Sequence, residues 1–450
     1  MIRSMSAVLV AATCAAACGM SRPEAQDGIE RLTAGDTLIV RNHAPLGAWG
    51  DTMTVATDLV IGAIDGAPEL LFGNIISLAA RRDGSILVLD QQARQLREFD
   101  ANGRYVRTMG RPGSGPGELQ MPMAVRVDPH DRAYILEANR RVTIFDKDGS
   151  LAGTWQVESM RVSYDLPIDT AGNVYVMVQL RPPVASAEAA GPRPPPRLAY
   201  VRYTADGVAG DTLPPDGWVY EPSDKRRITI ASGYDSKENF VPLGMTQIHP
   251  TGAIVTGNPT SYAIDMYMPA AGGPMRIGAE QAQPSVLRLE RVTEPAPITA
   301  GEAAEWQAYI RALMERETAQ RATVRMPPGV SLPPVREPYF PDQPVKPFYR
   351  WVSLGADGRV WVWRHATAVY HPPEMPPAPG ALPVPNWHEP NVQDVFEPDG
   401  TFLGTVVVPH GYVIRHRFGD QVWGTMRDDL DVQYVFRARL VPRRQPAAPS

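Results

Sequence analysis

Cysteine is nearly absent from this sequence, because its 450 residues include only 2, Cys14 and Cys18, both close to the start. Whatever folds beyond Cys18 has no thiol with which to form a disulfide or bind a metal ion. The stability of the folded part must therefore come from burial of apolar side chains.

Long apolar runs and an excess of basic charge are also absent. After the N-terminal region no apolar run approaches about 18 residues, the length that crosses a bilayer as a helix, so no transmembrane helix is predicted. Acidic residues (49) slightly outnumber basic ones (44), for a formal net charge of −5. This balance argues against nucleic acid as a partner.

The first residues have the organisation of an export signal. Arg3 supplies a positive charge, residues 7–17 are apolar but too short to span a bilayer, and residues 15–19 (AAACG) provide small residues for cleavage. This organisation resembles the signal of bacterial lipoproteins, in which the cysteine after the cut is lipidated. The resemblance implies a signal peptide over residues 1–17 and a lipid on Cys18. The alternative is an ordinary signal peptide that leaves a free cysteine.

Two copies of one pattern occupy residues 75–155. They read IISLAARRDGSILVLDQQARQLREFDANGRYVRTMG and MAVRVDPHDRAYILEANRRVTIFDKDGSLAGTW. Each has two apolar runs joined by a polar turn, a third run that ends in Phe, an Asp-x-x-Gly turn and a fourth run. The runs are short, contain β-branched residues and are bounded by Asp and Gly, which predicts strands. Each copy is therefore a four-stranded antiparallel meander.

A single meander exposes both faces of its sheet. Aligning Asp90 with Glu137 gives a period of 47 residues (137 − 90). Repetition at about 40 to 50 residues lets each sheet pack on its neighbours around a central axis. The predicted fold class is therefore an all-β propeller.

The two ends of the chain are predicted to share the last blade. Residues 59–78 align with residues 107–125, which follow the fourth strand of a blade, so residues 58–61 form a fourth strand as well. The other three strands lie at the C-terminus, at residues 412–416, 421–426 and 433–440. An N-terminal strand that completes this blade closes the ring and leaves no long sheet edge at the seam.

Further copies fill the chain between these ends. The third, fourth and fifth begin at residues 162–168, 245–249 and 349–354, which makes six blades in all. One position of the second strand is bulky in every blade: Leu87, Tyr134, Tyr175, Val255, Trp361 and Trp423. We expect each of these to be a wedge between blades. Trp361 and Trp423 are then core residues rather than ligand platforms.

The segments LEANRRVTIFDKDGSL and GRPGSGPGEL, the second at a blade junction, look like NHL-type repeats. With the signal, the whole arrangement resembles bacterial six-bladed β-propeller lipoproteins. The resemblance implies a propeller over residues 55–443, attached to a membrane through residues 18–54 and followed by a disordered tail at residues 444–450. Residues 18–54 are predicted to be a tether with a short N-terminal strand at residues 36–40. Gly19 is not the Asp that retains such proteins at the inner membrane, so the outer membrane is the expected location.

One helix is predicted inside the β pattern. Thr299 and Glu302 have the spacing of a capping box at the start of a helix that runs to about Arg321. Its apolar residues form one stripe: Trp306, Ile310, Leu313 and Met314. The helix and a Pro-rich run form an insertion at about residues 285–347. It either lies on the propeller with its stripe buried or acts as a lid or docking element.

Catalytic and metal-binding patterns are not evident. None of the 8 histidines has zinc-ligand spacing with a carboxylate partner, so no metal or other cofactor is predicted. The glycine-rich residues 110–117 lack a following Lys-Ser/Thr and lose amides to Pro. We interpret them as a blade-to-blade turn pinned by Glu118, not as a phosphate loop.

The first strands of the blades, nearest the axis, carry the best candidate for a binding site. One aligned position holds Ala79, Arg126, Pro167, Gln247, Ser353 and Arg415, and the next position holds mostly core residues with His416. Arginines in the channel, with Gln247 between them, favour an anionic group. The predicted ligand-binding residues are Arg126, Gln247, Ser353, Arg415 and His416. The alternative is that the arginines pair with carboxylates of neighbouring blades.

The sequence therefore predicts an exported, lipid-anchored module of the cell envelope that binds an anionic small molecule or another protein, on the face where the long insertions gather. The alternative is a channel-centred hydrolase or lyase that requires Ca²⁺ or Zn²⁺. Such an enzyme needs a ring of Asp, Glu, Asn or His on the inner strands. The inner strands hold Arg, Gln and Ser instead, so catalysis is not predicted.

Replacing Cys18 tests the anchor. Two acyl chains at about 0.8 kcal/mol per buried CH₂ attach a protein stably where one chain is marginal. We expect Cys18→Ala to abolish lipidation and leave the protein unprocessed or released. Metabolic labelling with a fatty acid, followed by gel electrophoresis, measures this, and unchanged labelling and mobility would contradict the prediction.

Overall fold

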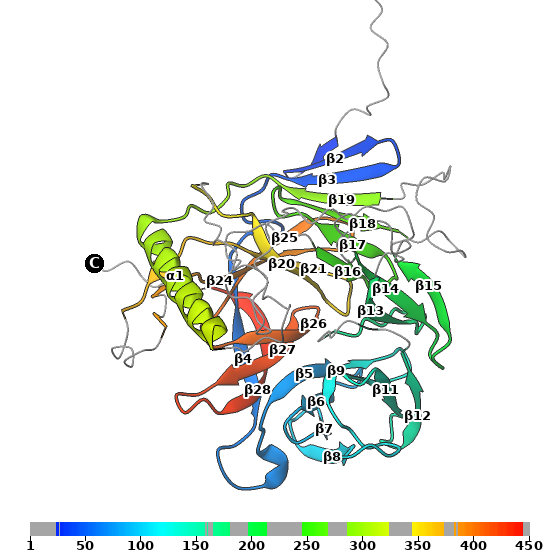
Figure 1. Cartoon of the computed structure of the whole chain (residues 1–450). Coiled ribbons are helices and arrows are strands. Elements are labelled where there is room, and N and C mark those ends of the chain that lie inside the picture. The colour runs from blue at the N-terminus through cyan, green and yellow to red at the C-terminus, as the bar shows by residue number, and fades with distance from the viewer. Residues whose placement is uncertain are drawn as a thin grey trace, which may run out of the picture.

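Six successive segments of the chain form sheets around one axis, which is the six-bladed all-β propeller that the repeats predict (Figure 1). The computed structural model describes residues 24–26, 28–157, 160, 165–180, 197–213, 245–268, 286–323, 344–372, 382–383 and 386–443. In these ranges no helix is long and apolar enough to cross a membrane.

The first two blades are four-stranded meanders, as predicted. Their strands are β5 (Ile75–Ala80), β6 (Ile86–Asp90), β7 (Gln95–Phe99) and β8 (Tyr105–Met109), then β9 (Pro122–Val127), β10 (Ala133–Glu137), β11 (Arg141–Phe145) and β12 (Leu151–Gln156). The carboxylate of Asp100 accepts from the backbone N–H groups of Asn102 (2.8 Å) and Arg104 (2.9 Å), and Gly103 adopts a φ of 78°. The Asp-x-x-Gly motif thus forms the turn locally.

The third and fourth blades contain β13 (Val174–Leu180), β14 (Arg197–Tyr203) and β15 (Ala209–Leu213), then β16 (Met245–Ile248), β17 (Ile254–Gly257), β18 (Ala263–Tyr267) and β19 (Val286–Arg291). The innermost strand predicted for the third blade lies partly outside the described residues, and Ile168 forms one bridge with Val174. The predicted start of the insertion at about residue 285 is wrong. Residues 286–291 are the fourth strand of the fourth blade, because Leu287 and Leu289 bury their side chains in this sheet.

The fifth blade contains β20 (Tyr349–Leu354), β21 (Val360–Arg364), β24 (Asn391–Phe396) and β25 (Phe402–Val408), with the short hairpin β22 (Val369–Tyr370) and β23 (Trp387–His388). The last blade contains β26 (Val413–Phe418), β27 (Gln421–Arg427), β28 (Gln433–Pro442) and β4 (Met53–Ile61). Strand β4 pairs antiparallel with β28, from Met53 opposite Pro442 to Ile61 opposite Val435. The predicted closure of the ring is confirmed, with a strand that begins at Met53 rather than residue 58.

Residues before β4 also tie neighbouring blades together. The strands β1 (Glu24–Gln26), β2 (Ile29–Ala34) and β3 (Thr37–Asn42) extend the fourth blade, where β3 lies parallel to β19. The N–H of Trp49 then donates to the carbonyl of Leu403 in the fifth blade (2.7 Å), and β4 runs parallel to β25. Residues 28–52, which the sequence predicted to be mainly a tether, therefore connect the fourth, fifth and last blades. We call them the strap.

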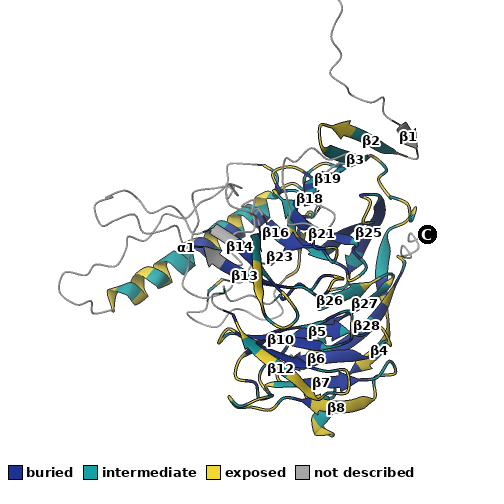
Figure 2. Ribbon diagram, turned by 90° about the vertical axis from the view of Figure 1, so that its right-hand side faces the viewer, coloured by how far each residue is buried: buried dark blue, intermediate teal, exposed yellow. Residues whose placement is uncertain are grey.

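The six wedge residues are buried as predicted, each at most 2 % exposed. Trp361 packs with Ile414 of the next blade, and Trp423 packs with Ile75 and Leu78 across the seam of the ring. Figure 2 shows that strand β6 is buried throughout and that strand β5 is mostly buried. The wedges fill the gaps between blades, so both tryptophans belong to the core.

Helix α1 (Ala300–Ala322) lies between the fourth and fifth blades in sequence and stands out on one side of the ring (Figure 2). The hydroxyl of Thr299 accepts from the N–H of Glu302 (3.2 Å), which confirms the N-cap. The carboxylate of Glu302 accepts from Lys346 instead of completing the capping box. Trp306 and Ile310 are buried, whereas the second half of the helix is largely exposed.

A buried ion network holds this helix on the propeller. Lys346 is 1 % exposed, and its ammonium donates to Glu302 of the helix (2.7 Å) and to Glu389 of the fifth blade (3.0 Å). Burial raises the pKa of Glu389, but His365, Arg350 and Lys346 more than offset this and hold that pKa well below its usual value. Because a buried charge that loses its partner is costly, the network fixes the first half of the helix.

Ring closure predicts the effect of N-terminal truncation. Deleting residues 1–62 removes β4 and the strap, so we expect one cooperative unfolding transition at a clearly lower temperature, or no folding. A control that lacks residues 1–23 keeps every described strand and should unfold like the full chain. Thermal melts followed by circular dichroism compare the three proteins. Closure would be unnecessary for stability if the longer truncation melted like the full chain.

Candidate functional site

Three predicted site residues hold equivalent positions on innermost strands. Each lies opposite the wedge residue of its own blade: Arg126 on β9, Gln247 on β16 and Ser353 on β20. Gln247 is 7 % exposed, whereas Arg126 and Ser353 are half-buried. The alignment of these three blades is thus correct.

The last blade departs from that alignment. The register of β26 with β27 shifts between Ile414 and His416, so that His416, not Arg415, lies opposite Trp423. A β-bulge of this kind adds one residue and reverses the faces of the side chains that follow it. The predicted equivalence of Arg415 with Arg126 is therefore wrong. His416, expected among core positions, takes that place.

Arg126 is anchored at the boundary of three blades. Its Nη1 donates to the carbonyl of Val125 (2.9 Å) and lies 3.5 Å from the hydroxyl of Ser77 in the first blade. Its Nη2 forms an ion pair with Asp165, which precedes the third blade. The expected pairing of an arginine with a neighbouring carboxylate is present for Arg126, and its side chain stays 31 % exposed.

Arg415 reaches the first blade from the opposite side. Its Nη1 donates to the carbonyl of Ile76, and its Nε donates to the hydroxyl of Thr425, both at 3.1 Å. Because Ile76 and Ser77 are consecutive in β5, Arg126 and Arg415 flank the same strand. Gln247 belongs to the fourth blade, on the other side of the ring. None of these contacts among the described residues joins Gln247 to either arginine, so its place between them stays a prediction.

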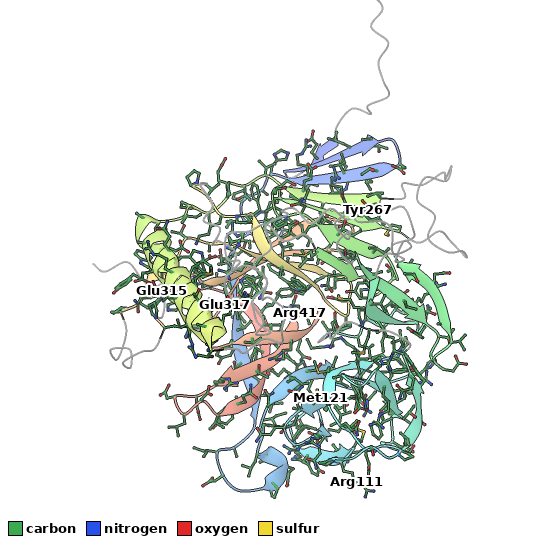
Figure 3. The ribbon with its side chains drawn as sticks, in the orientation of Figure 1. Arg111, Met121, Tyr267, Glu315, Glu317 and Arg417 are labelled. Atoms are coloured by element: carbon green, nitrogen blue, oxygen red, sulfur yellow. The ribbon has the colours of Figure 1, made fainter. Side chains whose placement is uncertain are left out.

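Sequence reasoning missed Arg417, which lies near the centre of the ring (Figure 3). Its guanidinium is 5.2 Å from the ring centroid of Trp361, and its Nη2 donates to Gln393 (3.3 Å). Among the described residues its Nε has no hydrogen-bond partner and no carboxylate forms an ion pair with it. Burial, with the charge of Arg126, lowers the pKa of Arg417 to about 10. The run Arg-His-Arg at residues 415–417 was the signal that could have found it.

The positive charges of Arg126 and Arg417 also affect the pKa of His416. Burial lowers the pKa of His416 to about 3, and the charges of Arg126 and Arg417 act in the same direction. His416 is consequently neutral at pH 7. We call Arg126, Arg415, His416 and Arg417 the channel cluster; it offers hydrogen-bond donors and net positive charge.

An exposed aromatic pair lies on the same blade as Ser353. Trp351 on β20 and Trp363 on β21 are directly opposite each other and are 48 % and 38 % exposed. The guanidinium of Arg350 is 5.7 Å from the ring centroid of Trp363. The aligned position that guided the sequence analysis did not include either tryptophan.

The structure also shows the surroundings of Glu118 and of the histidines, the other residues considered as candidates. Glu118 accepts from the N–H of Gly115 (2.8 Å) and pairs with Arg111 (2.9 Å), so it pins the glycine-rich turn as predicted. The rings of His371 and His388 lie 5.7 Å apart because β22 and β23 pair, a proximity that the sequence did not show. In the described part of the chain, no three His, Cys, Asp or Glu side chains converge as a metal site would require.

The sheets, wedges and closed ring define the class of protein, a six-bladed β-propeller. Residues 67–179 match a family model described as a 6-bladed beta-propeller. No curated protein matches the chain.

Several solved structures are similar at low identity. A member of the duf4221 family from Bacteroides vulgatus is 9 % identical, with 87 % of this chain and 99 % of that chain covered and a TM-score of 0.47. A protein of unknown function from Bacteroides caccae is 9 % identical, with coverages of 79 % and 92 % and a TM-score of 0.33. A catalytically inactive virginiamycin B lyase from Staphylococcus aureus with quinupristin is 10 % identical, with coverages of 85 % and 99 % and a TM-score of 0.37.

The lowered pKa of His416 predicts an acid-dependent loss of stability. The unfolded state binds a proton near pH 6.5, whereas folded His416 does so near pH 3, so its contribution to stability is full above pH 6.5 and is lost as pH falls toward 3. We expect His416→Gln to reduce the fall in unfolding free energy between pH 7 and pH 5 by roughly 1 to 2 kcal/mol.

Urea unfolding at a series of pH values measures this effect. His130→Gln is the matched control, because His130 is exposed in a turn of the second blade and should leave the pH dependence unchanged. Identical pH profiles for the wild type and both variants would show that His416 is not held neutral in the folded protein.

Proposed function

We propose that this protein is an exported, lipid-anchored binding module of the cell envelope whose central channel takes the anionic group of a small-molecule ligand. The channel cluster supplies the binding groups, with Ser353 on the adjacent blade. Gln247 contributes from the opposite side of the ring as a neutral donor and acceptor. This assignment follows the residues predicted from the sequence and adds Arg417.

The proposal rests mainly on the environment of Arg417. Arg417 is half-buried, and proteins normally pair a charge that is removed from water with an opposite charge, because the desolvation of an ion costs several kcal/mol. Arg417 has a π face and one amide oxygen as partners, and the neighbouring charge of Arg126 opposes its protonation. Arg126 already has Asp165 as a partner, so an anion bound at Arg417 would supply the negative charge that this arginine lacks.

The donors available in the channel match the needs of a carboxylate or phosphate. Arginine presents a planar fork of N–H groups that can bind two oxygens of an anion at once. Each charge-assisted hydrogen bond of this kind contributes about 1.5 to 3 kcal/mol. Neutral His416 adds one N–H donor without adding a further desolvated charge. Several such bonds would offset the cost of the unpaired guanidinium.

The cellular location rests on the N-terminal sequence. The proposed lipid on Cys18 precedes β1, which starts at Glu24, by six residues (24 − 18). Six extended residues reach at most about 20 Å, so the anchor would hold the rim of the fourth blade close to the membrane. Attachment at a rim leaves the channel accessible to soluble ligands. The residues after Cys18 favour the outer membrane.

Substitution of the arginines tests the proposed function. Binding of inorganic phosphate and of succinate to the full soluble domain is measured by isothermal titration calorimetry and by the shift in melting temperature. We expect Arg417→Gln and Arg126→Gln each to weaken binding about tenfold or more, which corresponds to loss of one charge-assisted bond. Arg417→Gln should also melt at the same or a higher temperature, because it removes an unpaired charge.

Arg439→Gln is the matched control, because Arg439 lies on β28, two strands away from the innermost strand β26, and its side chain is 71 % exposed. It should bind both anions like the wild type. Arg415→Ala tests whether this arginine binds the ligand or only stabilises the fold. A lower melting temperature without any change in binding, for all three channel arginines, would make them structural and would remove the proposed site.

A further inference from the structure

We propose that the ligand of the channel carries a flat ring directly attached to its anionic group, and that Trp351 and Trp363 form the surface on which this ring stacks. This inference rests on the proposed function. It is carried by a separate observation, the exposure of two large aromatic side chains on the inner strands of the fifth blade. We call Trp351 and Trp363 the aromatic pair.

The exposure of the aromatic pair contrasts with the other described tryptophans of the inner strands. Trp361 and Trp423 are almost completely buried, as wedges between blades. Trp351 and Trp363 are 48 % and 38 % exposed, although they occupy the two innermost strands and not the rim. Large aromatic surface that stays accessible next to a channel is typical of a ligand-binding surface.

The register of the fifth blade places the aromatic pair next to the channel cluster. The pair Trp351 and Trp363 is two cross-strand pairs away from the pair Ser353 and Trp361, and so lies on the same face of the sheet. The guanidinium of Arg417 lies over Trp361. Two residues of a strand span about 6.6 Å, so a ligand that touches both the aromatic pair and Arg417 carries its acidic group close to its ring.

The direction of β20 shows from which side such a ligand would enter. Strand β20 begins on the face where α1 joins the propeller and ends at the Asp357-Gly358 turn on the opposite face. Trp351 is near its start, whereas Ser353 is nearer its end. A ligand that enters from the face of α1 would therefore pass the aromatic pair before its anionic group reached Arg417.

The chemistry of the aromatic pair and of Arg417 restricts the kind of ligand that can bind. Indole rings stack on aryl rings and on the C–H faces of sugar rings, and arginine binds carboxylate or phosphate. The short separation requires the acidic group to be attached directly to the ring or through one atom. Aryl phosphates, aryl carboxylates and sugar phosphates have this form. Long-chain acids do not present a flat face at the required distance.

Paired probes that share one head group test the inference. Inorganic phosphate, phenyl phosphate and glucose 1-phosphate are titrated into the full soluble domain by calorimetry. We expect at least one of the two ring-bearing probes to bind about tenfold more tightly than inorganic phosphate, the size of effect that one stacked ring provides. The comparison between these two probes shows whether the ring is an aryl group or a sugar.

Variants of the aromatic pair assign the effect to these residues. Trp351→Ala and Trp363→Ala should each abolish most of the preference for the ring-bearing probe while inorganic phosphate binds within about twofold of the wild type. Trp351→Phe keeps a smaller ring and should retain part of the preference, which separates lost stacking from misfolding. Tyr105→Ala is the control, because it removes an exposed aromatic ring from the outer strand β8.

The outcomes distinguish this inference from the proposed function. If inorganic phosphate binds but neither ring-bearing probe binds more tightly, the aromatic pair has no role in ligand binding and only the anion site stands. If no probe binds, both proposals fail. If the wild type is a dimer by analytical ultracentrifugation and Trp351→Ala is a monomer, the aromatic pair is a subunit interface and the inference is wrong.

Discussion

The structure depends on the need of each blade to bury two faces of its sheet. A four-stranded meander has no core of its own, so every blade is stable only between two neighbours. The wedge residues satisfy this need, and the apolar contacts of Trp423 with Ile75 and Leu78 continue the packing across the seam. An open ring would leave two sheet faces and one long edge in water. Pairing of β4 with β28 is what prevents this.

Closure of the ring also brings together innermost strands from blades that are far apart in sequence, around one axis. Arg126 and Arg415 are 289 residues apart (415 − 126), yet both donate to or approach neighbouring residues of β5. The bulge in β26 determines which face of the strand the side chains after it occupy. It places His416 opposite Trp423 and directs Arg417 over Trp361. The channel cluster is thus a product of packing between blades.

Lys346 is buried and Arg417 is half-buried, and these two cations have different partners. Lys346 is enclosed by two glutamates and a backbone carbonyl, as expected for a charge whose role is to hold α1 in place. Arg417 has no such carboxylate among the described residues; it lies over the ring of Trp361 and donates to Gln393. Strong anchoring of the strap and helix can offset the cost of such a site. Functional sites often keep interactions that lower stability.

The amino-acid sequence by itself determined the strands, the Asp-x-x-Gly turns, the wedge positions and the pairing of the two chain ends, because each depends on local turn chemistry or on a repeated apolar period. The N-cap of α1 was visible for the same reason. The bulge at Arg415, the strap made by residues 28–52 and the exposure of Trp351 and Trp363 were decided only by the tertiary structure. A bulge changes which face a side chain occupies without changing composition, and exposure depends on what the neighbouring blade leaves uncovered. For that reason the sequence pointed to basic residues near the axis, whereas Arg417 and the aromatic pair emerged only when the blades were packed into a ring.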